Sequence, residues 1–168
     1  MVTVAGAALL AVSGSVVARC VADGPIETAR WIHAHQNGFD VFHTMQDAKL
    51  LRSFLSPQLY GLLEVEWRCQ VIEEGLCAVD TDPWTNAQHG RVLEPVTFEL
   101  ASTAGLRASV TMKFRLGRSD QDASQVVAAA ATLAMVKDAG SGCWQLDDVV
   151  GAQGRSLVTA LQGYRFYP

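Results

Sequence analysis

The chain has 168 residues, 49% of them apolar, and a formal net charge of −4. A chain of this length fits one domain that can bury a core of its own. Its lysines and arginines are scattered, which argues against a nucleic-acid partner, because neutralising phosphates requires a basic face.

The N-terminal residues predict an export signal. Residues 2–18 form an uncharged run of small and apolar side chains, and Val16 and Ala18 suit cleavage after Ala18. The run is too short and too rich in alanine and glycine for a membrane span, so no stable span is expected after its removal. No lysine or arginine precedes the run, and a buried N-terminal element is the alternative. Removal of residues 1–18 would leave a single periplasmic domain over residues 19–168.

The cysteines permit disulfides, because their number is even and the chain is expected to be exported. Cys69 and Cys77 are close enough in sequence for a local bridge at the end of a helix. Cys20 and Cys143 could pair or stay free, and unpaired buried thiols are the alternative for all of them. Cys20 would also suit a lipid anchor, although Arg19 departs from the small residue that lipid processing normally requires. No C-x-x-C spacing typical of zinc sites occurs.

Helices are predicted before any strand. Pro25, Glu27 and Gly38 suit the first turn and the end of a helix over residues 25–38. A shorter helix is predicted over residues 46–55, where alanine and leucine recur at helical spacing.

The third predicted helix has the clearest signals. Ser56 can accept hydrogen bonds from the first free amides, and Pro57 suits the first helical position. Gly75 is expected to end the helix in the left-handed conformation. One face carries apolar side chains at i, i+3 and i+4 spacing: Leu59, Leu62, Leu63, Trp67 and Val71.

The second half of the chain predicts strands. Apolar and polar residues alternate over residues 96–100 and 108–116, which indicates strands with one buried face. Residues 126–136 are apolar on both faces and predict a central strand covered on both sides. Residues 144–150 predict the last strand, and a short helix is expected over residues 155–161. The linking turns and loops are predicted at residues 103–105, 118–124 and 140–142. Helices followed by antiparallel strands indicate an α+β domain whose sheet curves around the helices.

The order of these helices and strands resembles the nuclear transport factor 2-like superfamily, and three motifs add to the resemblance. They are FLSPQL at residues 54–59, DTDPWTNAQ at residues 80–88 and WQLDDV at residues 144–149. The first two are similar to an exported bacterial branch of that superfamily whose function is uncharacterised, although His89 stands where that branch usually has an acidic residue. The resemblance covers roughly residues 25–161 and implies a cone, with N-terminal helices packed in the concave face of a bent sheet. The superfamily holds enzymes, ligand binders and interaction domains, so the fold does not choose a function.

The segment over residues 80–88 supplies the candidate binding residues: Asp80, Asp82, Trp84, Asn86 and Gln88. The two aspartates could form an acid–base pair, or a hard-cation site with Asn86 and Gln88. Carboxylates two residues apart on an extended segment point to opposite sides, and calcium needs more oxygens than this run supplies. Local capping by Asp82 and Asn86 is therefore the favoured interpretation, with ligand or partner contact next. Trp84 is the tryptophan expected to be exposed.

A catalytic pair is the weaker alternative. Its candidates are His33, His35 and Asp148, by analogy with superfamily enzymes that use an Asp–His pair in the cone. The two histidines diverge by about 200° on a helix, so they cannot hold one metal together. The sequence has no signature of a serine or cysteine nucleophile, and we expect neither a metal nor a cofactor.

The favoured function is a non-catalytic exported binding protein. It would contact a partner protein or a small ligand through the loops around residues 80–89. An immunity-type role, blocking a toxic enzyme in the periplasm, is one concrete form. The alternatives are a small hydrolase or isomerase with a cone pocket, and a structural dimerisation module that pairs through the outer face of the sheet.

Overall fold

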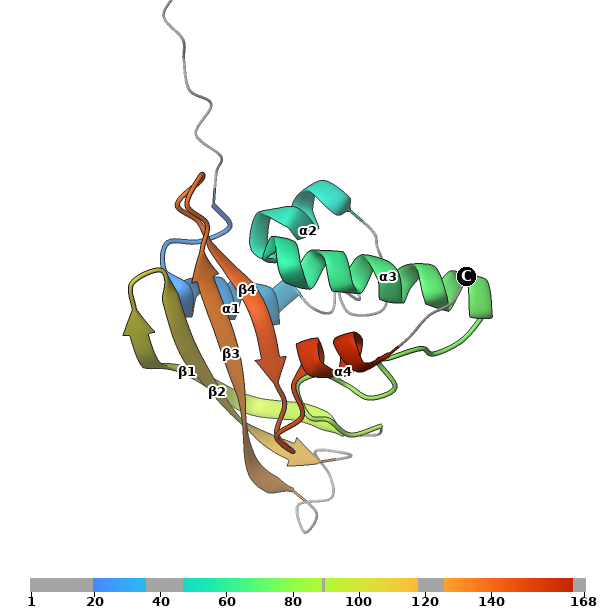
Figure 1. Cartoon of the computed structure of the whole chain (residues 1–168). Helices are drawn as coiled ribbons and strands as arrows, with labels where there is room; N and C mark the ends of the chain where they lie inside the picture. The colour runs from blue at the N-terminus through green and yellow to red at the C-terminus, as the bar shows by residue number, and fades with distance from the viewer. Residues whose placement is uncertain (1–19, 36–46, 89, 118–125, 165–168) are drawn as a thin grey trace, which may run out of the picture.

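The computed structural model describes residues 20–35, 47–88, 90–117 and 126–164. These residues form an α+β domain, as predicted. In chain order the elements are α1 (Pro25–His35), α2 (Ala48–Phe54), α3 (Pro57–Glu73), β1 (Arg91–Ala104), β2 (Arg107–Gly117), β3 (Val127–Lys137), β4 (Trp144–Val150) and α4 (Leu157–Gly163). The strands form one antiparallel sheet in the order β1-β2-β3-β4. Helix α1 packs across the sheet, and α2, α3 and α4 pack beside β4 (Figure 1).

Helices α1 and α2 begin where polar or proline residues can start them. Helix α1 begins at Pro25, and its last predicted residues, 36–38, lie outside the described residues. Helix α2 is shorter than predicted because Asp47 is its N-cap. The Asp47 carboxylate accepts hydrogen bonds from the Lys49 and Leu50 amides, which satisfies two of the free donors of the first turn.

The start of α3 is as predicted, but its end is not. The Ser56 hydroxyl accepts a hydrogen bond from the Leu59 amide at 3.1 Å, and Pro57 occupies the first turn. The left-handed residue at the C-terminus is Glu74 and not Gly75, and the Glu74 amide donates to the Gln70 carbonyl. Val71, expected on the buried face, is 78% exposed. The buried face of α3 therefore ends at Cys69, and the last turn of the helix extends beyond the core.

The sheet extends the predicted alternation over longer strands. Strand β1 starts at Arg91, well before the predicted residue 96, and its pairing with β2 is interrupted between Leu93 and Thr97. Pro95 lies in this interruption, which is where an edge strand tolerates a residue without an amide hydrogen. Gly105, with φ of 59°, makes the tight turn to β2. The predicted loop at 118–124 lies outside the described residues.

Strand β3 is the central strand that the sequence predicts, but it is covered on one side only. Ala131, Leu133 and Met135 are buried, whereas Ala128 and Ala130 are exposed. The alanines are apolar without being large, so a row of them can face solvent at little cost. The prediction of two covered faces was therefore wrong. Strand β4 has the predicted bounds, and α4 begins after its N-cap Ser156.

The core lies between the sheet and the helices. Its largest fully buried side chains include Trp84, Phe54, Ile32, Met112 and Leu133. A disulfide joins Cys20, in the segment that leads into α1, to Cys143, directly before β4. The bond uses the Cys20 sulfur, which is the atom that lipidation would modify. None of the helices in the described part of the chain has the length and apolar character needed to span a membrane.

Candidate functional site

Residues 78–88, hereafter the pocket segment, follow α3 and contain no helix or strand. Glu66 of α3 fixes their start. Its carboxylate accepts hydrogen bonds from the Ala78 amide at 2.8 Å and the Val79 amide at 3.2 Å. Gln70 donates a further hydrogen bond of 2.8 Å to the same carboxylate. Glu66 is only 2% exposed, so these donors, and not bulk water, satisfy the oxygens of its side chain.

The disulfide between Cys69 and Cys77 is the second anchor of the pocket segment. Cys69 lies on α3, about one helical turn after Glu66, and Cys77 is the residue directly before Ala78. The sequence pointed to this pair by its short spacing. No comparable pattern in the sequence indicated the role of Glu66, because the same helix carries further glutamates, such as Glu73, that are exposed.

Asp82 has a structural role within the pocket segment. Its Oδ1 accepts hydrogen bonds from the Trp84 and Thr85 amides at 3.0 and 2.8 Å, and from the Thr85 hydroxyl at 3.0 Å. The Asp82 carbonyl accepts a hydrogen bond of 2.7 Å from the Asn86 amide. The carboxylate therefore closes a tight turn, as expected for an aspartate before proline.

Asn86 connects the pocket segment to the loop between β4 and α4. Its φ of 54° is left-handed, a conformation that asparagine tolerates better than most residues. Its Oδ1 accepts a hydrogen bond of 3.1 Å from the Arg155 amide. The Asn86 side chain packs directly over Gly151, where a Cβ atom would collide with it. Gly151 and Arg155 were not singled out from the sequence, because they meet Asn86 only through the fold.

Trp84 is buried, contrary to the prediction that it is exposed. It is 2% exposed and belongs to the hydrophobic core. Its ring meets the His33 ring edge-on at 6.3 Å between centroids, and its carbonyl accepts a hydrogen bond of 3.0 Å from the Ala152 amide. The turn closed by Asp82 directs the indole into the core. The polar residues next to Trp84 in the sequence therefore do not make it exposed.

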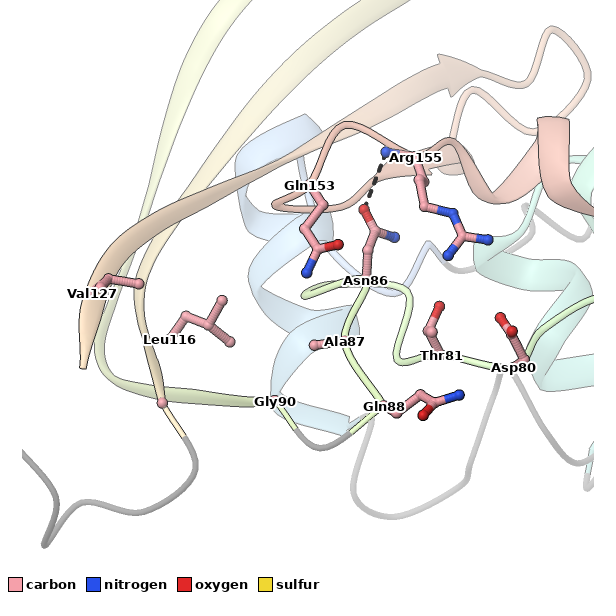
Figure 2. A pocket seen from close by; sticks show the side chains of 11 residues that line it. Asp80, Thr81, Asn86, Ala87, Gln88, Gly90, Leu116, Val127, Gln153 and Arg155 are labelled. Atoms are coloured by element: carbon pink, nitrogen blue, oxygen red, sulfur yellow. Dashed lines mark hydrogen bonds between the residues drawn. The ribbon is translucent and has the colours of Figure 1, made fainter. Parts of the chain in front are cut away.

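An open pocket of about 560 Å³ lies between the pocket segment, the loop after β4 and the ends of β2 and β3. Among the predicted binding residues, Asp80, Asn86 and Gln88 line it, and Asp82 and Trp84 do not. Figure 2 shows two unlike walls. Asp80, Thr81 and Arg155 lie on one side, and Leu116 and Val127 lie on the other. Residue His89, next to the pocket segment, lies outside the described residues.

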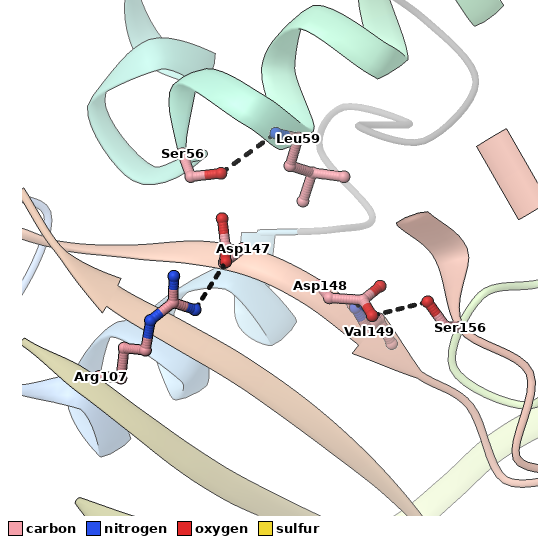
Figure 3. A network of polar contacts seen from close by, with 7 residues as sticks. All are labelled: Ser56, Leu59, Arg107, Asp147, Asp148, Val149 and Ser156. Atoms are coloured by element: carbon pink, nitrogen blue, oxygen red, sulfur yellow. Dashed lines mark hydrogen bonds and ion pairs between the residues drawn. The ribbon is translucent and has the colours of Figure 1, made fainter. Parts of the chain in front are cut away.

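The candidate catalytic residues have separate partners. The Asp148 carboxylate accepts hydrogen bonds from the Ser156 hydroxyl at 2.7 Å and the Val158 amide at 2.9 Å, and so caps the start of α4 (Figure 3). His35 stacks on Trp31, and its Nδ1 lies 2.7 Å from the Trp31 carbonyl. In the described ranges no hydrogen bond or ion pair joins Asp148 to either predicted histidine.

His33 contacts aromatic rings. It lies edge-on to Trp84 and to Phe98, with 5.7 Å between the His33 and Phe98 centroids. Burial lowers the pKa of His33 below its usual value, and the negative charge of Glu94 opposes part of that shift. The neutral imidazole is therefore favoured at this site.

Across the residues that the structure describes, no group of three or more histidine, cysteine or acidic side chains is arranged to hold a metal. Comparison of the chain with protein-family models, with curated proteins and with solved structures finds no match. The function is therefore argued from the pocket itself.

Proposed function

We propose that this protein is a non-catalytic, exported binding protein that holds its ligand in the pocket lined by Asp80, Asn86, Gln88, Gln153 and Arg155. The observation that carries the proposal is this pocket of about 560 Å³, in which polar side chains from two distant parts of the chain converge. Concave sites with a few convergent polar groups are where proteins usually bind small molecules.

A binding function fits the site better than catalysis does. The Asp148 carboxylate is occupied at the start of α4, and His33 is held among aromatic rings. A general base needs hydrogen-bond reach to its proton and a partner that orients it. The pocket residues Asp80 and Arg155 bear charge, but neither is joined to a nucleophile in the described parts of the chain.

Export is supported by the cysteines. All the cysteines of the chain are in disulfides, Cys20 with Cys143 and Cys69 with Cys77. Structural disulfides persist in oxidising compartments such as the periplasm. With the apolar residues 2–18, this supports export to the bacterial envelope. The order of helices and antiparallel strands supports membership of the nuclear transport factor 2-like superfamily, with the sheet as the wall of a cone.

The test is retention of a ligand by the purified, oxidised full chain. The protein is incubated with a cell-envelope extract, and retained molecules are identified by mass spectrometry. Gln88→Trp places an indole at the mouth of the pocket and should abolish retention. Gln58→Trp, on the exposed start of α3, is the matched control and should retain the ligand. Equal retention by both variants would contradict the proposal. A retained protein that depends on Gln88 would assign the pocket to a partner, as an immunity-type role requires.

A further inference from the structure

The inner wall of the pocket carries a side-chain amide that finds no acceptor among the described residues. Asn86 is 8% exposed, and its Oδ1 already accepts the Arg155 amide hydrogen. Its Nδ2 donates to no atom of the described residues and points toward the side chains of Thr81 and Arg155 (Figure 2). The Nδ2 atom is not among the fully buried polar atoms that lack a partner, so it is accessible from the pocket and can donate to a ligand that offers an acceptor.

Opposite charges lie on the same wall without neutralising each other. Asp80 and Arg155 both line the pocket, and both are exposed. Neither takes part in an ion pair within the described ranges. A ligand can therefore meet a carboxylate and a guanidinium at once.

The facing wall is apolar. Leu116 and Val127 come from the paired ends of β2 and β3, and they lie across the pocket from Asp80 and Arg155 (Figure 2). Val127 is 56% exposed. A ligand that covers it removes apolar surface from water, which is favourable.

From these walls we infer that the pocket binds a small zwitterion with an aliphatic part, such as a free amino acid or a short peptide. The inference rests on the proposed function and names its ligand class. The ligand carboxylate pairs with the Arg155 guanidinium and accepts from Asn86 Nδ2, and its ammonium group pairs with Asp80. The aliphatic part covers Leu116 and Val127. Guanidinium suits a carboxylate because its planar donors match the two oxygens.

The same charges exclude other classes of ligand. A polyphosphate would meet one arginine among the described residues that line this pocket, and it would be repelled by Asp80. A polyamine would meet one carboxylate in the described lining of the pocket, and it would be repelled by Arg155. A ligand with one charge of each sign is the class that uses both groups.

The test uses leucyl-alanine as the probe and isothermal titration calorimetry on the oxidised full chain. Its N-acetyl derivative lacks the ammonium group, and its amide lacks the carboxylate. Each should bind about tenfold more weakly than leucyl-alanine, since a charge-assisted hydrogen bond at an accessible site has about that effect. Glycyl-glycine should also bind more weakly, because it lacks the aliphatic part.

Variants assign each charge to its residue. Arg155→Gln should bind leucyl-alanine about tenfold more weakly and should no longer distinguish it from its amide. Asp80→Asn should likewise no longer distinguish it from the N-acetyl form. Arg68→Gln and Asp23→Asn, exposed and not part of the pocket lining, should bind as the unmodified chain does. No binding of leucyl-alanine at millimolar concentration, or equal binding of all derivatives, would overturn the inference.

The two proposals fail separately. If Gln88→Trp abolishes retention from the extract while leucyl-alanine does not bind, the pocket is a binding site and the zwitterion inference is wrong. If leucyl-alanine binds to Gln88→Trp and to Arg155→Gln as tightly as to the unmodified chain, it binds outside the pocket. The inference is then also wrong.

Discussion

The sheet and the pocket segment are stabilised by different kinds of contact. In β1, β2 and β3, consecutive strands pair antiparallel, and buried side chains recur at every second residue of β2. The pocket segment has no such repeat. It is held by single side chains from distant places: Glu66, Cys69 and the loop at Gly151 and Arg155. Regular strands spread their stability over many residues, whereas the pocket segment concentrates it in a few atoms. Four measurements test that contrast.

The largest effect should come from the disulfides, one in each region. Cys20–Cys143 closes a loop of 123 residues, and Cys69–Cys77 closes a loop of 8. In the chain-entropy model, loops of these lengths correspond to about 5 and about 2.5 kcal/mol of stability. Urea unfolding of the two paired Cys→Ser variants should show the larger loss for Cys20 and Cys143. A larger loss of unfolding free energy for the Cys69 and Cys77 variant would mean that this disulfide stabilises the folded state through local contacts and not through the entropy of the unfolded chain.

Glu66→Ala should lower the free energy of unfolding by about 3 kcal/mol, because two backbone amides lose a charged acceptor. Urea unfolding measures the loss. Glu73→Ala, an exposed residue near the end of the same helix, is the control and should change stability by less than about 0.5 kcal/mol. Equal effects of the two variants would show that Glu66 does not anchor the pocket segment.

Gly151→Ala should destabilise the protein by about 2 kcal/mol, because the added methyl group meets the Asn86 side chain. It should also weaken ligand retention, because Asn86 lines the pocket. Gly61→Ala is the matched control in α3, where a Cβ meets open space. That change should stabilise by about 0.5–1 kcal/mol, since alanine is the better helix former. Thermal and urea unfolding distinguish the opposite signs.

The smallest effect should be the pH dependence caused by His33. Its pKa is lowered in the folded protein by burial, so the unfolded chain takes up a proton first as the pH falls. Stability should therefore decrease as the pH drops below about 6.5, the ordinary histidine value. His33→Gln should reduce this decrease, as measured by Tm between pH 7.5 and about 5. His35→Gln, on the same helix, is the matched control. An identical pH profile for His33→Gln and the unmodified chain would contradict the assignment.

Local patterns were sufficient for the elements of the fold. Alternation predicted β2 and part of β1, and the Ser56–Pro57 pair predicted the start of α3. The wrong predictions concern residues whose type alone does not determine their exposure or their backbone conformation. The alanines of β3 were expected to be covered on both sides, although small side chains remain stable in water. Gly75 was expected to be left-handed, but the chain adopts this conformation one residue earlier, at Glu74.

The site was predictable only in part. Asp82 closes its own turn, so the sequence around it sufficed to favour capping. Asn86 also forms part of that turn, but its partners Arg155 and Gly151 lie far along the chain and carry no local motif. Glu66 resembles any other acid on a helix surface until the fold places two amides over it. Whatever depends on contacts between distant segments requires the coordinates.

The bonds between the pocket segment and the loop after β4 have a consequence for recognition. Trp84 accepts the Ala152 amide hydrogen and Asn86 accepts that of Arg155, so the two segments that form the polar wall are joined before any ligand arrives. A ligand does not have to order the backbone of this wall when it binds, so little of its binding free energy is offset by the entropy of ordering the protein. The site is preorganised, and it should discriminate by shape and charge placement and not by closing over its guest.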